Sequence, residues 1–86
     1  MPRVEVYTKA FCPYCSRALS LLKGRDVPYD EHDVTMGGPL KAEMVERTNG
    51  RLTVPQIFIG DTYLGGCDDL VAADRSGKLD RLLSAA

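Results

Sequence analysis

The 86-residue sequence has no tryptophan, one histidine and no long run of apolar residues. No stretch approaches the roughly 18 apolar residues of a membrane span, and the N-terminus lacks the apolar core of a signal peptide. Eleven basic and twelve acidic residues leave a net charge of −1, so no basic surplus exists to attract nucleic acid or an anionic membrane. We therefore expect a cytoplasmic protein that binds neither nucleic acid nor membrane.

Cysteine is also scarce, with three residues, two of which form the CxxC pair Cys12 and Cys15. A secreted disulfide scaffold usually carries an even number of cysteines, and closely spaced thiols in a reducing compartment are more often catalytic or metal-binding. A zinc site would need further ligands, and the sequence offers only Cys67 and His32. We interpret His32 as a solvated residue, so redox chemistry is favoured and no metal site is expected.

Hydrophobic periodicity predicts the order β-α-β-α-β-β-α. Two strands joined through a helix form a parallel pair, and the closing hairpin adds antiparallel strands. The sequence therefore predicts an α/β fold, a mixed four-stranded sheet flanked by helices, in one domain over 1–86. The expected strands are 4–8, 29–34, 54–59 and 62–64. The first expected helix begins at 13 and is capped by Gly24, and the second covers 40–48. A last helix begins at 70, is interrupted by Gly77 and is followed by a short helical tail at 79–83.

The position of Cys12 next to a helix start predicts how the pair divides its chemistry. Pro13 suits the first turn of a helix, whose unpaired N–H groups and dipole then favour the thiolate of Cys12, with Lys9 adding positive charge. The thiolate is the form that attacks disulfides. Cys15 lies one turn further in and is less exposed. We therefore predict that Cys12 is the nucleophile and Cys15 the resolving thiol.

Several other residues allow both a structural and a functional interpretation. Tyr14 is either an exposed aromatic or a wall of the substrate groove, and Pro55 either starts a strand or faces the active site. Asp68 has the residue type of a helix N-cap, and it could contact a ligand at the same helix end. Cys67 is interpreted as a partly buried small residue rather than a catalytic one.

Three sequence blocks together resemble the dithiol glutaredoxins, most closely the small bacterial members. The blocks are Tyr7-Thr8-Lys9-x-x-Cys12-Pro13-Tyr14-Cys15, Thr53-Val54-Pro55-Gln56-Ile57-Phe58-Ile59 and Gly65-Gly66-Cys67-Asp68-Asp69-Leu70. The resemblance covers essentially the whole chain. It implies a thioredoxin-like fold with Pro55 as a cis-proline facing the active site.

The resemblance also implies that glutathione is the reducing co-substrate and that no redox cofactor is bound. Lys9 and Tyr14 would border the glutathione groove, and Val54 would pair its backbone with the cysteinyl part, beside Thr53. The segment Gly66-Cys67-Asp68 would meet the γ-glutamyl end. Lys41 is the match for the residue that meets the glycine carboxylate, with Arg47 and Arg51 as rivals.

The implied enzyme reduces protein–glutathione mixed disulfides through Cys12 and protein disulfides through Cys12 and Cys15. Its partners would be glutathionylated or disulfide-containing proteins, with ribonucleotide reductase as one candidate, and indirectly glutathione reductase and NADPH. A monomer is expected. Two alternatives stay open: a thioredoxin-like protein reduced by a flavoprotein, which the lack of tryptophan disfavours, and iron–sulfur binding, which Cys15 and Pro13 disfavour.

Overall fold

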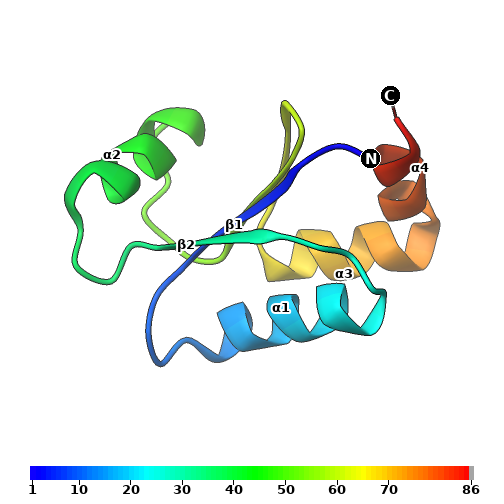
Figure 1. Ribbon diagram of the computed structural model, residues 1–86. Coiled ribbons are helices and arrows are strands. Elements are labelled where there is room, and N and C mark those ends of the chain that lie inside the picture. The colour runs from blue at the N-terminus through cyan, green and yellow to red at the C-terminus, as the bar shows by residue number, and fades with distance from the viewer. Residues whose placement is uncertain (86) are drawn as a thin grey trace.

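The computed structural model describes residues 1–85 and contains a four-stranded sheet with helices on both faces (Figure 1). Its strands are β1 (Val4–Thr8), β2 (Asp30–Asp33), β3 (Gln56–Ile59) and β4 (Thr62–Gly65), and its helices are α1 (Pro13–Gly24), α2 (Gly38–Arg47), α3 (Cys67–Ser76) and α4 (Lys78–Ser84). The strand order is β2-β1-β3-β4, with β1 parallel to β2 and antiparallel to β3, and β3 antiparallel to β4. The expected mixed sheet is confirmed.

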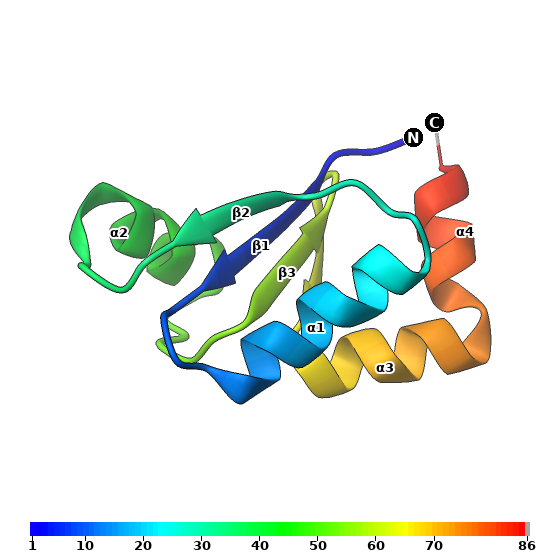
Figure 2. The ribbon, with the colours of Figure 1, turned by 60° about the horizontal axis from the view of Figure 1, so that its bottom comes forward.

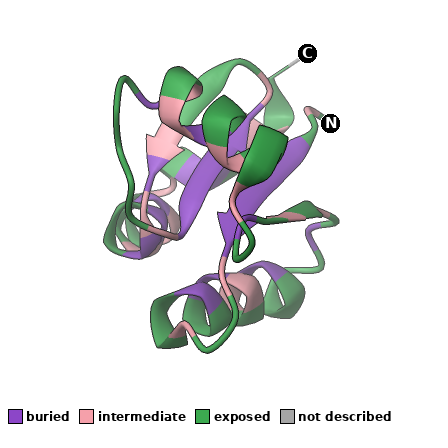
Figure 3. Cartoon of the chain, turned by 90° about the vertical axis from the view of Figure 1, so that its left-hand side faces the viewer, coloured by how far each residue is buried: buried purple, intermediate pink, exposed green. Residues whose placement is uncertain are grey.

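One face of the sheet packs against α1 and α3, which lie side by side, while α2 covers the other face (Figure 2). Buried residues are concentrated in the central strands and on the inner sides of the helices (Figure 3). All five residues of β1 are buried because helices cover both faces of that strand. The edge strand β2 is mostly exposed and polar, which discourages pairing with another sheet.

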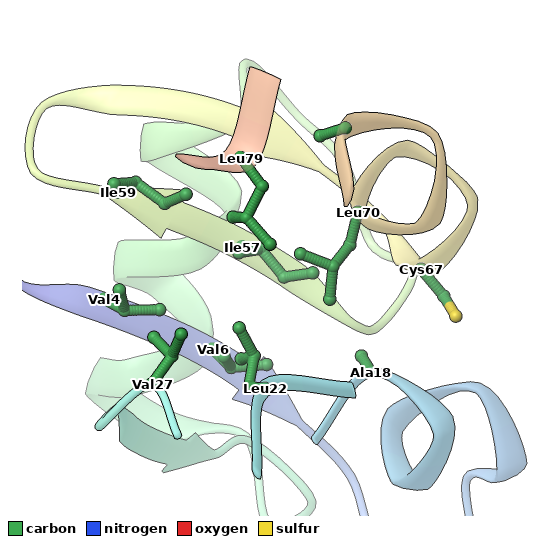
Figure 4. Close-up of a cluster of buried hydrophobic side chains, with 11 residues drawn as sticks. Val4, Val6, Ala18, Leu22, Val27, Ile57, Ile59, Cys67, Leu70 and Leu79 are labelled. Carbon is green, nitrogen blue, oxygen red and sulfur yellow. The ribbon is translucent and has the colours of Figure 1, made fainter. Parts of the chain in front are cut away.

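The larger apolar cluster lies between the sheet and α1 and α3 (Figure 4). Helix α1 contributes Ala18 and Leu22, which continue the stripe that starts at Cys15 and repeats with helical spacing. The rest of the cluster comes mainly from alternate residues of β1 and β3 and from α3 and α4: Val4, Val6, Ile57, Ile59, Leu70, Ala73 and Leu79. This packing fixes the N-terminal ends of α1 and α3 relative to β3.

The opposite face of the sheet carries a smaller cluster that is partly polar. Tyr7 and Phe58 are buried there with Met44 of α2, the buried residue of that helix. The Arg47 guanidinium lies 3.8 Å from the centre of the Phe58 ring and donates a hydrogen bond to the Tyr7 hydroxyl at 2.8 Å. Arg47 is therefore committed to packing α2 against the sheet.

Glu5 is the buried acidic partner in this polar cluster, which also contains Glu43. Its carboxylate accepts a hydrogen bond from Arg47 at 3.1 Å and lies 3.1 Å from His32 Nε2. The interpretation of His32 as a solvated residue is wrong, because its side chain is only 17% exposed and pairs with Glu5. Within residues 1–85, the one group of three possible metal ligands is Glu5, His32 and Glu43, and it contains no cysteine.

Most element boundaries differ from the sequence-based expectation by one to three residues, and four of these differences concern the starts of two helices, the cap of α1 and the start of β3. Strand β3 begins at Gln56 rather than 54, because Pro55 has no N–H to donate to the ladder. Helix α2 begins at Gly38 rather than 40, and α3 begins at Cys67 rather than 70. Gly24 lies inside α1, whose C-cap is Arg25. No helix in residues 1–85 is long and apolar enough to cross a membrane.

The buried Glu5 carboxylate predicts a loss of stability in acid. Burial acts to raise its pKa, but the hydrogen bonds from Arg47 and His32 outweigh burial and hold the pKa below the ordinary value of 4.5. A carboxyl whose folded-state pKa is lowered stabilises the protein above its unfolded pKa, and that contribution is lost as pH falls through the folded pKa. We expect Glu5→Gln to lower the free energy of unfolding at neutral pH by roughly 1–3 kcal/mol.

Urea denaturation of the parent and of Glu5→Gln at neutral pH and at a pH below the lowered folded-state pKa of Glu5 checks this prediction. The difference between the two proteins should shrink in acid, because the parent then loses the charge on Glu5. An equal difference at both pH values would contradict it. Asp61→Asn, which replaces an exposed carboxylate in the β3–β4 turn, is the matched control.

Candidate active site

Cys12 occupies the N-cap position of α1. Its backbone is extended, with φ −109° and ψ 105°, and Pro13 is the first helical residue. The Cys15 backbone N–H donates a hydrogen bond to the Cys12 sulfur at 3.2 Å, and the Ser16 N–H donates to the Cys12 carbonyl at 3.1 Å. The sulfur thus takes the place that a Ser or Asp oxygen has at other helix N-caps. The positive end of the helix dipole stabilises negative charge there.

The chain enters this helix through an unusual backbone turn. Phe11 has φ 56°, a left-handed conformation that few non-glycine residues adopt, and its side chain is fully exposed. The preceding Ala10 N–H donates to the Thr35 hydroxyl at 2.8 Å. This bond anchors the loop before Cys12 to the connection between β2 and α2.

Cys15 is in a very different environment from Cys12. It is 3% exposed, on the buried stripe of α1, whereas Cys12 is half-buried. Burial raises the pKa of the Cys15 thiol to about 12, and the hydrogen bond with Cys12 acts in the same direction. Cys15 is therefore a protonated thiol at neutral pH. The inequality of the two sulfurs that the helix start predicted is present in the structure.

The segment before β3 faces Cys12 from the other side. The Val54–Pro55 peptide bond is cis, as the resemblance implied, and the Val54 carbonyl oxygen lies 4.0 Å from the Cys12 sulfur. Pro55 is buried next to the start of α3, where a Cβ on Gly66 would lie 3.4 Å from the Pro55 carbonyl oxygen. A glycine at position 66 therefore allows these two loops to approach closely.

The N-terminus of α3 forms the third part of the site. Gly66 is the N-cap, and its backbone N–H donates to the Asp69 carboxylate at 2.9 Å. The structural interpretation of Asp68 as the N-cap is wrong, because Asp68 is the second helical residue. Asp69, the third helical residue, is the acid that binds the N-cap N–H. Asp68 is exposed, and its carboxylate makes no side-chain hydrogen bond or ion pair within residues 1–85.

A cleft of about 200 Å³ runs between these three segments. It is lined by the predicted residues Tyr14, Thr53, Val54, Pro55, Gly66, Cys67 and Asp68, and also by Arg51, Gln56 and Asp69. Cys67 is 4% exposed and lies at the margin of the apolar cluster (Figure 4). Burial raises the pKa of its thiol, which fits the prediction that it is not catalytic.

Two of the predicted glutathione contacts do not line the cleft. The backbone of Lys9 lies near the Cys15 sulfur and acts to lower the pKa of that thiol, against the larger effect of burial. The Lys41 side chain lies over Gly37 at the start of α2, where a Cβ on Gly37 would be 3.9 Å from its Cδ. Arg47 is committed to Glu5 and Tyr7. Among the three basic rivals, only Arg51 lines the cleft.

Two lining residues, Gln56 and Asp69, were not predicted as site residues. Gln56 is the polar residue in the otherwise apolar stretch of β3, and Asp69 stands three residues after a helix-capping glycine. These patterns could have indicated a buried amide and a capping carboxylate. They could not have indicated that both face the same cleft.

Comparisons with known proteins agree with this geometry. The glutaredoxin family model matches residues 4–64. A glutaredoxin of Pseudomonas aeruginosa is 52% identical over 85 residues, which cover 99% of this chain and 100% of that protein. Glutaredoxin 3 of Escherichia coli is 49% identical over 83 residues, which cover 96% of this chain and 99% of that protein.

The chain belongs to the glutaredoxin family.

Solved glutaredoxin structures have the same fold. The solution structure of glutaredoxin from Brucella melitensis has a TM-score of 0.82 and 51% identity, covering 96% of this chain and 89% of that one. A buckwheat glutaredoxin–glutathione complex has a TM-score of 0.83 and 30% identity, covering 96% and 77%. The expected thioredoxin-like fold is confirmed. Glutaredoxins are glutathione-dependent thiol-disulfide oxidoreductases, and so is this chain.

The turn into α3 predicts the effect of a glycine substitution. Gly65 has φ 119°, and a Cβ there would overlap the Asp69 carboxylate that caps the helix. We expect Gly65→Ala to lower the free energy of unfolding by roughly 1–3 kcal/mol, from backbone strain and a displaced cap.

Gly24→Ala is the matched control, because a Cβ at Gly24 has no atom within 4 Å and the residue is helical. We expect this control to be neutral or to stabilise by up to about 1 kcal/mol. Chemical denaturation of both variants measures the difference. Equal effects of the two substitutions would mean that the Gly65 backbone is not constrained as described.

Proposed function

We propose that the chain reduces mixed disulfides between glutathione and protein cysteines through Cys12 alone, and disulfides within proteins through Cys12 and Cys15 together. The observation that carries this proposal is the inequality of the two sulfurs. Cys12 is accessible and receives an N–H hydrogen bond at a helix N-terminus, whereas Cys15 is buried and protonated. The first sulfur suits attack on an external disulfide, and the second suits a later, intramolecular step.

In the first route, the Cys12 thiolate attacks the glutathione sulfur of the mixed disulfide. The protein thiolate leaves and takes up a proton, and Cys12 is now joined to glutathione. The thiolate of a second glutathione attacks that same glutathione sulfur, which releases glutathione disulfide and regenerates the Cys12 thiolate. In sum, one glutathione is consumed, and the protein–glutathione mixed disulfide becomes a free protein thiol and glutathione disulfide.

In the second route, Cys12 forms a mixed disulfide with the protein substrate. Cys15 loses its proton and displaces the substrate thiolate, leaving a Cys12–Cys15 disulfide, which two molecules of glutathione then reduce. Because its pKa is high, the Cys15 thiol stays protonated and unreactive until a mixed disulfide forms on the neighbouring Cys12. Its position one helical turn from Cys12 supports the intramolecular step.

We further propose that the cleft holds glutathione, the molecule with which the buckwheat relative forms its complex. Val54 offers the cysteinyl part a backbone N–H that has no backbone partner within residues 1–85, and Asp68 offers a carboxylate to the γ-glutamyl ammonium. Arg51 offers a guanidinium to the glycine carboxylate. Tyr14 borders the cleft near Cys12. The resemblance assigned glutathione contacts to Lys9 and Lys41 as well, but neither residue lines the cleft.

Other expectations from the sequence stay predictions. They are the absence of a bound redox cofactor, the supply of electrons from NADPH through glutathione reductase, and a monomeric protein in the cytoplasm. Ribonucleotide reductase stays one candidate among the protein substrates. A protein disulfide can serve as a substrate if it reaches the exposed part of the Cys12 sulfur.

Serine variants of the two cysteines test the division of roles. In an assay coupled to glutathione, glutathione reductase and NADPH, Cys12→Ser should lose all activity toward a glutathionylated peptide. Cys15→Ser should keep it, because the first route does not use Cys15. Toward an intramolecular protein disulfide, Cys15→Ser should be strongly impaired. Equal losses in both variants toward the glutathionylated peptide would contradict the assignment, and activity with thioredoxin reductase alone would overturn the dependence on glutathione.

Neutralising Arg51 tests the proposed contact with the glycine carboxylate. We expect Arg51→Gln to raise the KM for the glutathionylated peptide by roughly threefold to tenfold at unchanged kcat, as loss of one partly exposed charged hydrogen bond should. Lys41→Gln removes the same charge outside the cleft and should have a smaller effect. A larger effect of Lys41→Gln would restore the assignment that the resemblance favoured.

A further inference from the structure

The side-chain amide of Gln56 lies directly behind the segment that faces Cys12. Gln56 is 2% exposed and is the first residue of β3, immediately after Pro55. Its Nε2 donates hydrogen bonds to the Thr53 carbonyl oxygen at 2.9 Å and to the Thr53 hydroxyl at 3.1 Å. Its Oε1 accepts a hydrogen bond from the Tyr63 hydroxyl at 2.5 Å. All hydrogen-bonding atoms of this amide are therefore engaged by Thr53 and Tyr63.

The chemistry of these partners allows one orientation of the amide. The Thr53 carbonyl oxygen can only accept a hydrogen bond, so the nitrogen of the amide must face Thr53. The amide oxygen then faces Tyr63, whose hydroxyl can donate to it. Reversing the Gln56 amide would place two oxygens against each other at Thr53 and bury an unpaired N–H group.

Tyr63 is itself held in place by aromatic packing on the α2 face of the sheet. It is the register partner of Phe58 on the neighbouring strand, and the two rings stack with their centres 5.0 Å apart. Phe58 also lies beneath the guanidinium of Arg47. The Tyr63 hydroxyl is therefore a fixed donor whose position is set by the sheet and by α2.

The segment that Gln56 holds is otherwise supported by side-chain packing, since Pro55 is buried and Val54 packs against the smaller cluster. Within residues 1–85, no backbone–backbone hydrogen bond outside the helices and strands involves Thr53, Val54 or Pro55. Pro55 has no N–H to give. The Val54 N–H is therefore without a backbone partner in the described part of the chain. The position of the segment depends on side-chain contacts, and the amide of Gln56 makes two of them.

We propose that Gln56 is a positioning residue that holds the Thr53–Pro55 segment opposite Cys12, with the Tyr63 hydroxyl anchoring the oxygen of its amide. The inference rests on the function proposed above. Gln56 acts through the backbone of Val54 and not on the Cys12 sulfur. Its loss should weaken binding of the glutathione part of the substrate while leaving the chemical step at saturation unchanged.

Three variants of the full chain test this inference in the coupled assay with a glutathionylated peptide. Gln56→Met keeps the volume and removes both hydrogen bonds to Thr53. We expect it to raise KM by roughly tenfold with kcat within about twofold of the parent. Tyr63→Phe removes only the hydroxyl that anchors the amide oxygen, so it should raise KM by a smaller factor.

Gln56→Glu adds a readout that a purely structural role would not give. A protonated carboxyl group can still donate one hydrogen bond to Thr53, whereas an ionised one presents only acceptors to its carbonyl oxygen. The KM of Gln56→Glu relative to the parent should therefore recover as pH is lowered. The corresponding ratio for Gln56→Met should stay constant over the same pH range.

Tyr29→Phe is the matched control, because it removes the hydroxyl of a half-buried tyrosine packed against the α1 and α3 cluster, away from the cleft. Its KM should equal that of the parent. Parent-like KM values in both Gln56→Met and Tyr63→Phe would overturn the inference. It would also be overturned if these variants lost kcat in proportion to a fall in their melting temperature, because the loss would then come from unfolding. A parent protein without glutathione-dependent turnover would instead refute the proposed function.

Discussion

The hydrogen bond from the Cys15 backbone N–H to the Cys12 sulfur is the contact on which the site depends. It forms because residue 12 is extended while Pro13 begins a helix, so the sulfur sits over the first helical turn. The same turn carries Cys15 to the buried side of α1, beside Ala18 and Leu22. One structural element therefore makes one sulfur accessible and the other protected.

The cleft beside this sulfur exists because the sheet brings three distant segments together. Strand β1 leads into Cys12, β3 begins directly after Pro55, and β4 ends where α3 starts. The order β2-β1-β3-β4 places β1 and β3 side by side, so the cis-proline segment faces the helix start. The two clusters on opposite faces hold this order, one of them apolar and the other built around Arg47.

Much of this arrangement could be predicted from the sequence, because local patterns specify local structure. The apolar stripe of α1 and the helix start at Pro13 were enough to separate the roles of Cys12 and Cys15. The three blocks that resemble glutaredoxins indicated Pro55 and the α3 loop. The family, the thioredoxin-like fold and the glutathione-dependent activity all agree with these predictions.

What the sequence could not predict depends on contacts between distant residues. A basic residue on α2 could be assigned to the glycine carboxylate, but only packing shows that Arg47 is committed to Glu5 and Phe58. Asp68 has the residue type of an N-cap, yet Gly66 takes that position because Asp69 binds its N–H. The role of Gln56 requires knowing that Tyr63 lies across the hairpin. Pattern-based prediction has no access to such pairings.

The inequality of the two sulfurs is tested most directly by alkylating the reduced protein with iodoacetamide over a range of pH and locating the label by mass spectrometry. The account predicts that Cys12 alone is modified at neutral pH and that Cys15 reacts only under strongly alkaline conditions, as its pKa of about 12 requires. Modification of Cys15 at neutral pH at a rate comparable with Cys12 would contradict it.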